Sequence, residues 1–506
     1  MKKLRSYILD HKRESIILAG ILILAAVMRM YRIGDYMTFL GDEGRDAIIV
    51  RRLLVYGDPI LIGPGTSIGN MYLGPLYYYF IAPSLFLANF SPVGPSLFIA
   101  LVGILTVALV WWVAKDWFGS RGALVASFLF AIAPTVIIYS RASWNPNIMP
   151  FFALLSIYSF WRVAMDRDYR FLIVGSISFA FVMQSHYLGL LLAPTMGVAW
   201  LMAFWQSKKK KRFAIISVVA LAVFLFLMSP LVIFDARHGW INGKALQKFL
   251  FERQTTVSAK PWNALPKAYP IYEEIVTRVV AGRNIAFGKW VAISILGVYV
   301  WLFTKKNLIT NRQRMALLYL GLWFGVSLVG LGVYKQQIYD HYYGFLFAVP
   351  FLVIAAGYQV VTKKYPFRGL WLGVTALVFL TFYNFLESPL KYAPPMQLTR
   401  TAKISKTIED EAGGEKFNLA VIAERNYEDA YQYFLERSGT KVTDIDALRA
   451  DETITKQLYV VCELPKEKCD PTHNPKTEVA NFGWSVIEKE WSVDGIMIYK
   501  LVHSEQ

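Results

Sequence analysis

The chain has 506 residues, of which 55% are hydrophobic and only 18% are charged, and its formal net charge is +17. Soluble domains carry roughly 25% charged residues, so this composition excludes an ordinary soluble globular protein. Long apolar runs recur along the first 390 residues, each near the roughly 20 residues that a helix needs to cross a bilayer. The clearest are residues 16–30, 97–113, 213–234, 290–303, 315–333 and 369–385. We therefore expect an integral membrane protein.

The charge is divided unevenly along the chain. Residues 391–506 hold 15 basic and 20 acidic residues, and the first 390 hold 38 basic and 16 acidic residues. The basic residues lie in short loops between the apolar runs, in segments 2–13, 208–212, 305–314 and 363–368. This is the positive-inside pattern, which places these loops and the N-terminus in the cytoplasm. The excess charge thus orients the protein in the plasma membrane, and we expect no nucleic-acid partner.

The same pattern places loops 33–71 and 235–287, and the C-terminal segment, outside the cytoplasm. A cytoplasmic N-terminus and an extracytoplasmic C-terminus require an odd number of spans, whereas counting apolar runs gives twelve. The apolar residues 171–205 are interrupted by Gln184, Ser185 and His186. If this stretch is one broken helix, the total is eleven spans; if a span has been missed elsewhere, the total is thirteen. We predict an α-helical polytopic protein with about 11–13 transmembrane helices over residues 1–390.

Residues 391–506 are a different kind of chain. Helical periodicity alternates with short buried-strand patterns at 419–423, 458–462 and 495–501, which predicts a small extracytoplasmic α/β domain. Prolines at 389, 394 and 395 mark the linker. Cys462 and Cys469 are the two cysteines of the chain. Both a disulfide and free thiols are compatible with their position outside the membrane, and two cysteines make a poor metal site.

The first extracytoplasmic loop carries an acidic cluster, Gly-Asp-Glu-Gly-Arg-Asp at residues 41–46. Ionisable groups at a membrane boundary are costly to desolvate and therefore tend to mark a functional site. Residues 48–53 fit an amphipathic helix lying in the interface. Asp42 precedes that segment, where a carboxylate is also favoured simply as a helix cap. The cluster therefore has a functional and a structural interpretation.

A resemblance follows from the order of these features. A basic N-terminus, one span, an outside loop with an Asp-Glu pair, an amphipathic helix and then Gly-Pro-Leu-Tyr-Tyr at 74–78 resemble the GT-C glycosyltransferases. The nearest branch is the protein O-mannosyltransferase and ArnT-like group. Segments 139–142, 184–189 and 340–350 resemble later landmarks of the family. Many relatives have His-Pro-Pro-Leu before the Tyr-rich segment, where this chain has Met-Tyr-Leu-Gly-Pro-Leu at 71–76.

The resemblance implies transfer of a sugar from a polyprenyl-phosphate donor to a protein, lipid or glycan acceptor on the extracytoplasmic face, with inversion. Asp42 would be the general base, and Glu43 would orient the acceptor or tune Asp42. Hydrogen-bond donors and cations would stabilise the charge that develops on the leaving phosphate. The candidates for contacts with donor phosphate or substrate are Arg141, His186, Arg237, Lys335, His341 and Tyr342. A divalent cation on Asp42, Glu43 and Asp46 is possible, but the resemblance implies no required metal or other cofactor.

The main alternative is a transporter or flippase for a lipid-linked sugar or another solute. Transporters tend to bury charges in mid-helix and often have repeated halves, whereas the acidic residues here lie mostly in loops. An oligosaccharide ligase and a non-catalytic scaffold for the tail are further alternatives. The chain has no Walker A, His-Glu-x-x-His or Gly-x-Ser-x-Gly pattern, which argues against an ATPase, a zinc protease and a serine hydrolase.

Overall fold

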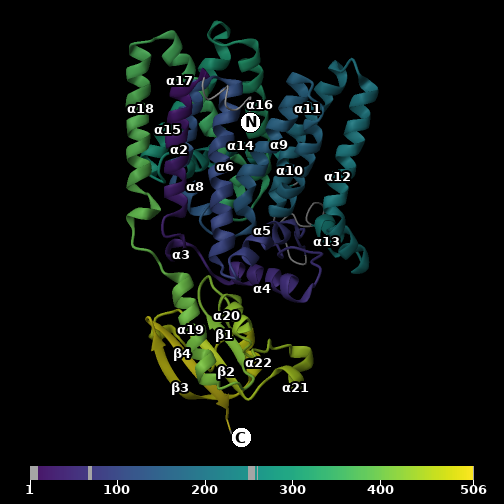
Figure 1. The fold of residues 1–506 in the computed structure, drawn as a ribbon, viewed down its shortest axis with the longest axis vertical. Helices are drawn as coiled ribbons and strands as arrows, with labels where there is room; N and C mark the ends of the chain where they lie inside the picture. The colour runs from purple at the N-terminus through teal and green to yellow at the C-terminus, as the bar shows by residue number, and fades with distance from the viewer. Residues whose placement is uncertain (1–9, 67–70, 249–256, 259, 505–506) are drawn as a thin grey trace.

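The computed structural model describes residues 10–66, 71–248, 257–258 and 260–504. Figure 1 shows a bundle of long helices with a small sheet-containing domain attached at one end. Short segments connect the helices or flank the bundle: α3 (Ile33–Tyr36), α13 (Ile241–Gln247), η4 (Pro261–Ala264), α14 (Leu265–Val279), η5 (Lys306–Leu308) and η7 (Pro389–Lys391). The architecture confirms the predicted polytopic helical protein with a C-terminal α/β domain.

Within the described residues, seven helices are long and apolar enough to cross a membrane. The number is eight when η6 (Asp340–Leu346) and α17 (Ala348–Lys364), which meet at 46°, count as one span. The seven are α6 (Val93–Trp117), η1 with α9 (Asn145–Asp166), η2 with α11 (Tyr187–Gln206), α12 (Lys210–Arg237), α15 (Ile285–Thr304), α16 (Asn311–Val333) and α18 (Arg368–Leu386). The chain is a multi-pass membrane protein.

Three further segments connect the two ends of the bundle, although they are shorter or more charged. They are α2 (Lys12–Met30), α7 (Ser120–Ile132) continued by α8 (Pro134–Tyr139), and α10 (Phe171–Ser185). Added to the eight spans, these three give eleven traverses in the described residues. Residues 171–205 are thus two antiparallel helices that meet at His186, not one broken helix.

The twelfth apolar run is α5 (Leu76–Leu87), and it does not traverse the bundle. The amide of Leu76, at its start, donates to Gln184 at 3.2 Å, near the end of α10 that faces the C-terminal domain. Phe90, just past its end, accepts a hydrogen bond from Tyr433 of the C-terminal domain. Both ends of α5 therefore lie on the same side, and counting it as a span was the error in the sequence-based total.

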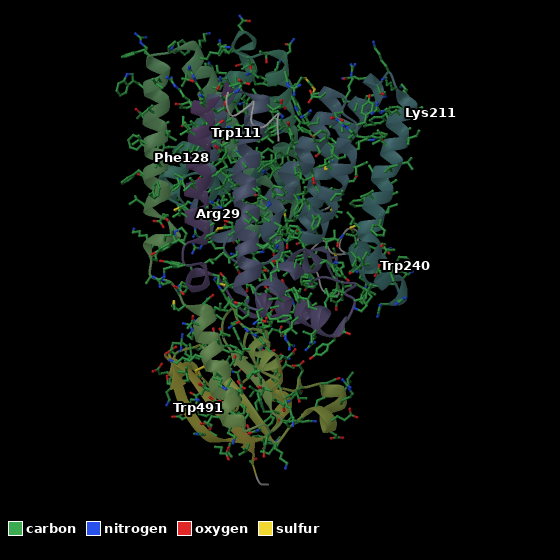
Figure 2. All side chains as sticks on the ribbon, viewed as in Figure 1. Arg29, Trp111, Phe128, Lys211, Trp240 and Trp491 are labelled. Carbon is green, nitrogen blue, oxygen red and sulfur yellow. A yellow bond between two sulfur atoms is a disulfide. The ribbon has the colours of Figure 1, made fainter. Side chains whose placement is uncertain are left out.

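The two ends of the bundle differ in charge. Figure 2 shows Lys211, from the basic run 208–212, and Trp491 of the C-terminal domain at opposite ends of the molecule. Lys115 pairs with Glu14 at 2.8 Å. At the same end, Arg312 pairs with acidic residues near the ends of α6 and α9. The described parts of the basic loops thus lie together on the side away from the C-terminal domain, while residues 2–9 of the first basic segment lie outside the described residues.

Arg29 stabilises a helix break in the middle of the bundle. Pro134 has no N–H to offer the carbonyl of Phe130, four residues earlier, and the chain breaks between α7 and α8. The fully buried guanidinium of Arg29 donates to the carbonyls of Ala131 at 2.9 Å and Phe130 at 3.4 Å. Unsatisfied carbonyls in a bilayer cost several kcal/mol each, so Arg29 substitutes for missing backbone donors.

The C-terminal domain is a four-stranded sheet in the order β1-β2-β4-β3, with helices packed against it. Strands β1 and β2 are parallel and the other pairs are antiparallel. A disulfide joins Cys462, at the end of β2, to Cys469. The elements are α19 (Gln397–Ala412), β1 (Asn418–Ile422), α20 (Asp429–Ser438), η8 (Ala447–Arg449), α21 (Ala450–Thr453), β2 (Gln457–Cys462), η9 (Lys466–Lys468), α22 (Thr477–Phe482), β3 (Ser485–Val493) and β4 (Ile496–His503).

The domain is docked on the bundle through a shared hydrophobic core. Buried side chains of α4 (Gly41–Tyr56) and the segment before it pack with buried side chains of α19, α20 and the sheet. The members from both sides include Met37, Phe39, Ala47, Ile48, Ile404, Phe417, Tyr431 and Tyr433. The amphipathic helix expected to lie at the membrane surface is thus sandwiched between the bundle and the domain, and it places the acidic cluster at their junction.

Candidate active site

A cavity of about 240 Å³ lies at this junction, beside the N-terminus of α4. Four of the residues singled out in the sequence line it together: Asp42, His186, His341 and Tyr342. They come from α4, from the break between α10 and η2, and from η6. The other lining residues are Arg45, Pro64, Gly65, Thr66, Leu73, Trp144, Asn145, Pro146 and Tyr187.

The first turn of α4 separates the two adjacent acids. Leu40 is the N-cap residue, and its amide donates to the carboxylate of Glu43 at 3.0 Å. Glu43 is 7% exposed and does not line the cavity, whereas the side chain of Asp42 is 40% exposed and does. Glu43 therefore closes the helix start, as a Glu at the third position commonly does. Asp42 is not the helix cap and is available for chemistry.

Two donors converge on one oxygen of Asp42. Arg45, one turn later on α4, donates to Oδ1 at 2.8 Å. The hydroxyl of Tyr427 donates to the same Oδ1 at 2.6 Å. The guanidinium of Arg45 also donates to the buried carboxylate of Asp46 at 2.8 Å, and Asp46 accepts a further hydrogen bond from Tyr78. Arg45 thus bridges the exposed acid and a buried one.

Burial changes the titration of the two acids that flank the cavity. It raises the pKa of Glu43 to about 8, and the nearby charges of Asp42 and Asp46 act in the same direction. Burial also raises the pKa of Asp46 to about 6, against the opposing effect of Arg45. At neutral pH Glu43 therefore holds its proton, and Asp42 is the carboxylate of the cluster that faces the cavity.

Rings of histidine and aromatic residues form another part of the cavity wall. His186 stacks on Tyr187 with ring centroids 4.5 Å apart and lies 4.7 Å from Tyr342. His341 packs against Trp144 at 4.5 Å. The Nδ1 atom of His186 accepts a hydrogen bond from the amide of Leu188 at 3.2 Å, so this nitrogen is unprotonated. Flat rings with polar edges suit a ligand that has both apolar faces and hydroxyl groups.

The three cations proposed from the sequence do not line this cavity. Arg141 is 3% exposed and donates to the carbonyls of Met28 and Tyr31, each at 2.7 Å, while it stacks on Tyr36. Arg237 lies at the exposed end of α12, and Lys335 is exposed between α16 and η6. Among the described residues, Arg45 is the basic side chain that lines the cavity.

Sequence reasoning missed several lining or contacting residues. Tyr427 lies 385 residues from Asp42 in the chain, and no local pattern signals their contact. Tyr187 lies within the family landmark at 184–189, and Trp144 lies two residues after the one at 139–142, so these landmarks were a signal that could have been used. Arg45 was visible within the acidic cluster itself.

The acids proposed as a possible cation site do not converge. Glu43 faces the helix start, and Asp46 is bonded to Arg45 and Tyr78. In the part of the chain that the structure describes, no three His, Cys, Asp or Glu side chains are placed to share one metal ion.

Comparison with known proteins identifies the fold. Residues 73–234 match the family model described as dolichyl-phosphate-mannose-protein mannosyltransferase, a match that begins after the acidic cluster. No curated protein matches the chain in sequence. ArnT from Cupriavidus metallidurans, in a crystal structure bound to undecaprenyl phosphate, is similar over 96% of this chain and 97% of its own, with a TM-score of 0.59 and 14% identity.

Two structures of the Archaeoglobus fulgidus oligosaccharyltransferase are also similar. The complex with Zn and sulfate has a TM-score of 0.55 and 15% identity over 88% of this chain and 67% of that chain. The complex of this enzyme, AglB, with an inhibitory peptide and a dolichol-phosphate has a TM-score of 0.54 and 13% identity over 90% and 69%. The chain is thus a multi-pass membrane protein with the fold of the GT-C glycosyltransferases, which confirms the resemblance seen in its sequence.

Proposed function

We propose that this protein is a membrane glycosyltransferase that transfers a sugar from a polyprenyl-phosphate donor to an acceptor on the extracytoplasmic face. The observation that carries the proposal is Asp42, a partly exposed carboxylate that lines a cavity at the end of the membrane bundle on which the C-terminal domain is docked. The similarity to ArnT bound to undecaprenyl phosphate and to AglB with dolichol-phosphate supports a lipid-linked donor.

In the proposed reaction the acceptor oxygen attacks the anomeric carbon of the sugar as Asp42 removes its proton. The bond between the anomeric carbon and the phosphate oxygen breaks, and its electron pair leaves with the polyprenyl phosphate. Attack and departure occur on opposite faces of the ring, so the configuration inverts. His186, His341 and Tyr342 line the same cavity as Asp42 and are proposed to donate hydrogen bonds to the departing phosphate.

The size of the cavity favours a single sugar. At about 240 Å³ it lies below the roughly 300 to 1,000 Å³ of sites for drug-sized ligands. This argues against an oligosaccharide ligase. A separate apolar groove of about 620 Å³ between α14, α15, α16 and α17 offers a surface for the isoprenoid tail, which dissolves in the bilayer. It includes Val349 and Pro350, shortly after η6.

The buried charges of the bundle favour an enzyme over a transporter. Arg29 and Arg141 donate to main-chain carbonyls, and neither lines the cavity at the junction. The basic loops opposite the C-terminal domain support an extracytoplasmic position for that domain by the positive-inside rule. We propose that the N-terminus lies in the cytoplasm, which a reporter fused to the C-terminus would test.

The test of the function is donor turnover by the purified full-length protein. A panel of polyprenyl-phosphate sugars is incubated with candidate acceptors, and released polyprenyl phosphate is measured for wild type and for Asp42→Asn. The matched control is Asp35→Asn, because Asp35 pairs with Arg32 at 2.6 Å and does not line the cavity. We expect turnover in wild type and Asp35→Asn and its loss in Asp42→Asn. Equal turnover in all three would contradict the role of Asp42, and no turnover with any donor would contradict the transferase.

A further inference from the structure

The C-terminal domain reaches the candidate base directly. Tyr427 lies between β1 and α20, and its hydroxyl donates to Oδ1 of Asp42 at 2.6 Å. Arg45 donates to the same oxygen at 2.8 Å, and its guanidinium lies 3.3 Å from the Tyr427 hydroxyl. Both of these donors bind Oδ1, and neither binds Oδ2 of the same carboxylate. One oxygen of Asp42 is thus held by two donors, and the other is left to accept a proton.

The segment that carries Tyr427 is itself fixed to α4. The side-chain oxygen of Asn426 accepts from the amide of Gly41 at 2.9 Å and from the amide of Tyr427 at 2.9 Å. The side-chain nitrogen of Asn426 donates to the carboxylate of Glu463 at 2.6 Å, and the hydroxyl of Tyr431 donates to the same carboxylate oxygen. Hydrogen bonds thus connect the ends of β1 and β2 to the first turn of α4.

The glycines around the acidic pair are explained by this contact. A Cβ at Gly41 would lie 2.5 Å from ring atoms of Tyr427, and a Cβ at Gly44 would overlap the carbonyl oxygen of Asp429. Any larger residue at either position would push the domain away from the helix. Glycine on either side of the acidic pair therefore allows the C-terminal domain to lie close to Asp42.

We propose that Tyr427 is a positioning residue for Asp42, so that the C-terminal domain completes the active site. The inference rests on the proposed function. Tyr427 and Arg45 fix the rotation of the carboxylate, so that its other oxygen is held ready to accept the proton of the acceptor. The domain thereby acts on the chemistry through one hydroxyl group.

The test is the split between kcat and KM in Tyr427→Phe. This variant keeps the ring against Gly41 and removes only the hydroxyl. With one of its two donors gone, the carboxylate of Asp42 is held less firmly for proton transfer, while the cavity wall that binds the substrate is unchanged. We therefore expect kcat to fall about tenfold, with KM within about twofold of the wild-type value. The control is Tyr433→Phe, which removes a hydroxyl bonded to the carbonyl of Phe90 at the same domain interface. Its kcat and KM should both match those of wild type.

The outcomes separate this inference from the proposed function. If wild type turns over and Tyr427→Phe has the same kcat, or if Tyr433→Phe loses as much, positioning by Tyr427 is wrong and the transferase stands. If wild type turns over no donor, the proposed function fails, and a double-mutant cycle of melting temperatures for Asp42→Asn and Tyr427→Phe judges the contact. Shifts that are less than additive would support a direct interaction, and additive shifts would overturn it.

Discussion

Replacing Gly44 by Ala tests whether the C-terminal domain is seated on α4 as described. In an exposed helix this change stabilises by about 0.5–1 kcal/mol, because Ala loses less backbone entropy than Gly. At Gly44 the new Cβ would overlap the Asp429 carbonyl oxygen and would lie 2.5 Å from the Ala430 amide nitrogen. Both are main-chain atoms that cannot rotate away, and overpacking costs about 1–3 kcal/mol. With the middle value of each range, the net loss is about 1 kcal/mol, unless α20 retreats from α4.

The assay compares apparent melting temperature in detergent and turnover for this variant. Gly20→Ala is the matched control, because Gly20 lies in α2 and a Cβ added there would have no atom within 4 Å. We expect Gly44→Ala to melt several degrees lower and to lose turnover, since Tyr427 would withdraw with the domain, while Gly20→Ala melts at or above the wild-type temperature. A Gly44→Ala protein that is as stable and as active as the control would refute the docking.

Two more predictions concern buried charge. The pKa of Glu43 is about 8 in the folded protein against 4.5 for the free group, so its contribution to stability is present below about pH 4.5 and lost as the pH rises through 8. Glu43→Gln should therefore raise the melting temperature at pH 8.5 and reduce the difference in melting temperature between pH 5.5 and 8.5. An unchanged difference would be evidence against burial of Glu43 as an acid. Arg29→Met should destabilise by about 1–3 kcal/mol because the carbonyl of Phe130 loses its donor. Adding Pro134→Ala, which restores a backbone N–H for that carbonyl, should recover part of the loss in thermal unfolding, and no recovery would mean that Arg29 has another role.

Local patterns in the sequence predicted the features that depend on local physics. The apolar runs, the basic loops and the strands β1, β2 and β4 were identified because hydropathy and periodicity act over short stretches, whereas β3 was missed. The helix at α4 was expected from its amphipathic pattern, and Asp42 lies at the cavity that this helix borders. His186 was singled out because an ionisable ring in an apolar segment is costly without a role, and His341 because its short loop must approach the membrane surface.

What the sequence could not supply were the contacts between distant segments. The apolar composition of α5 is that of a span, and only its contacts with Gln184 and the C-terminal domain show that it stays on one side. Arg141 is a residue type that often binds phosphate, yet its two terminal nitrogens donate to the carbonyls of Met28 and Tyr31. The contact of Tyr427 with Asp42 joins the two domains, and no pattern in the sequence of either domain predicts it.

The comparison of Asp42→Asn with Glu43→Gln tests the central claim most directly. The two acids are neighbours in the chain, but one lines the cavity and the other closes the helix start. With the donor identified by the panel, the measurement is the rate of polyprenyl-phosphate release by each variant, together with its affinity for the donor. We predict that Asp42→Asn binds the donor and releases no product, and that Glu43→Gln keeps most of the wild-type rate. Equal loss in both variants, or a rate for Asp42→Asn close to that of wild type, would contradict the assignment of Asp42 as the base.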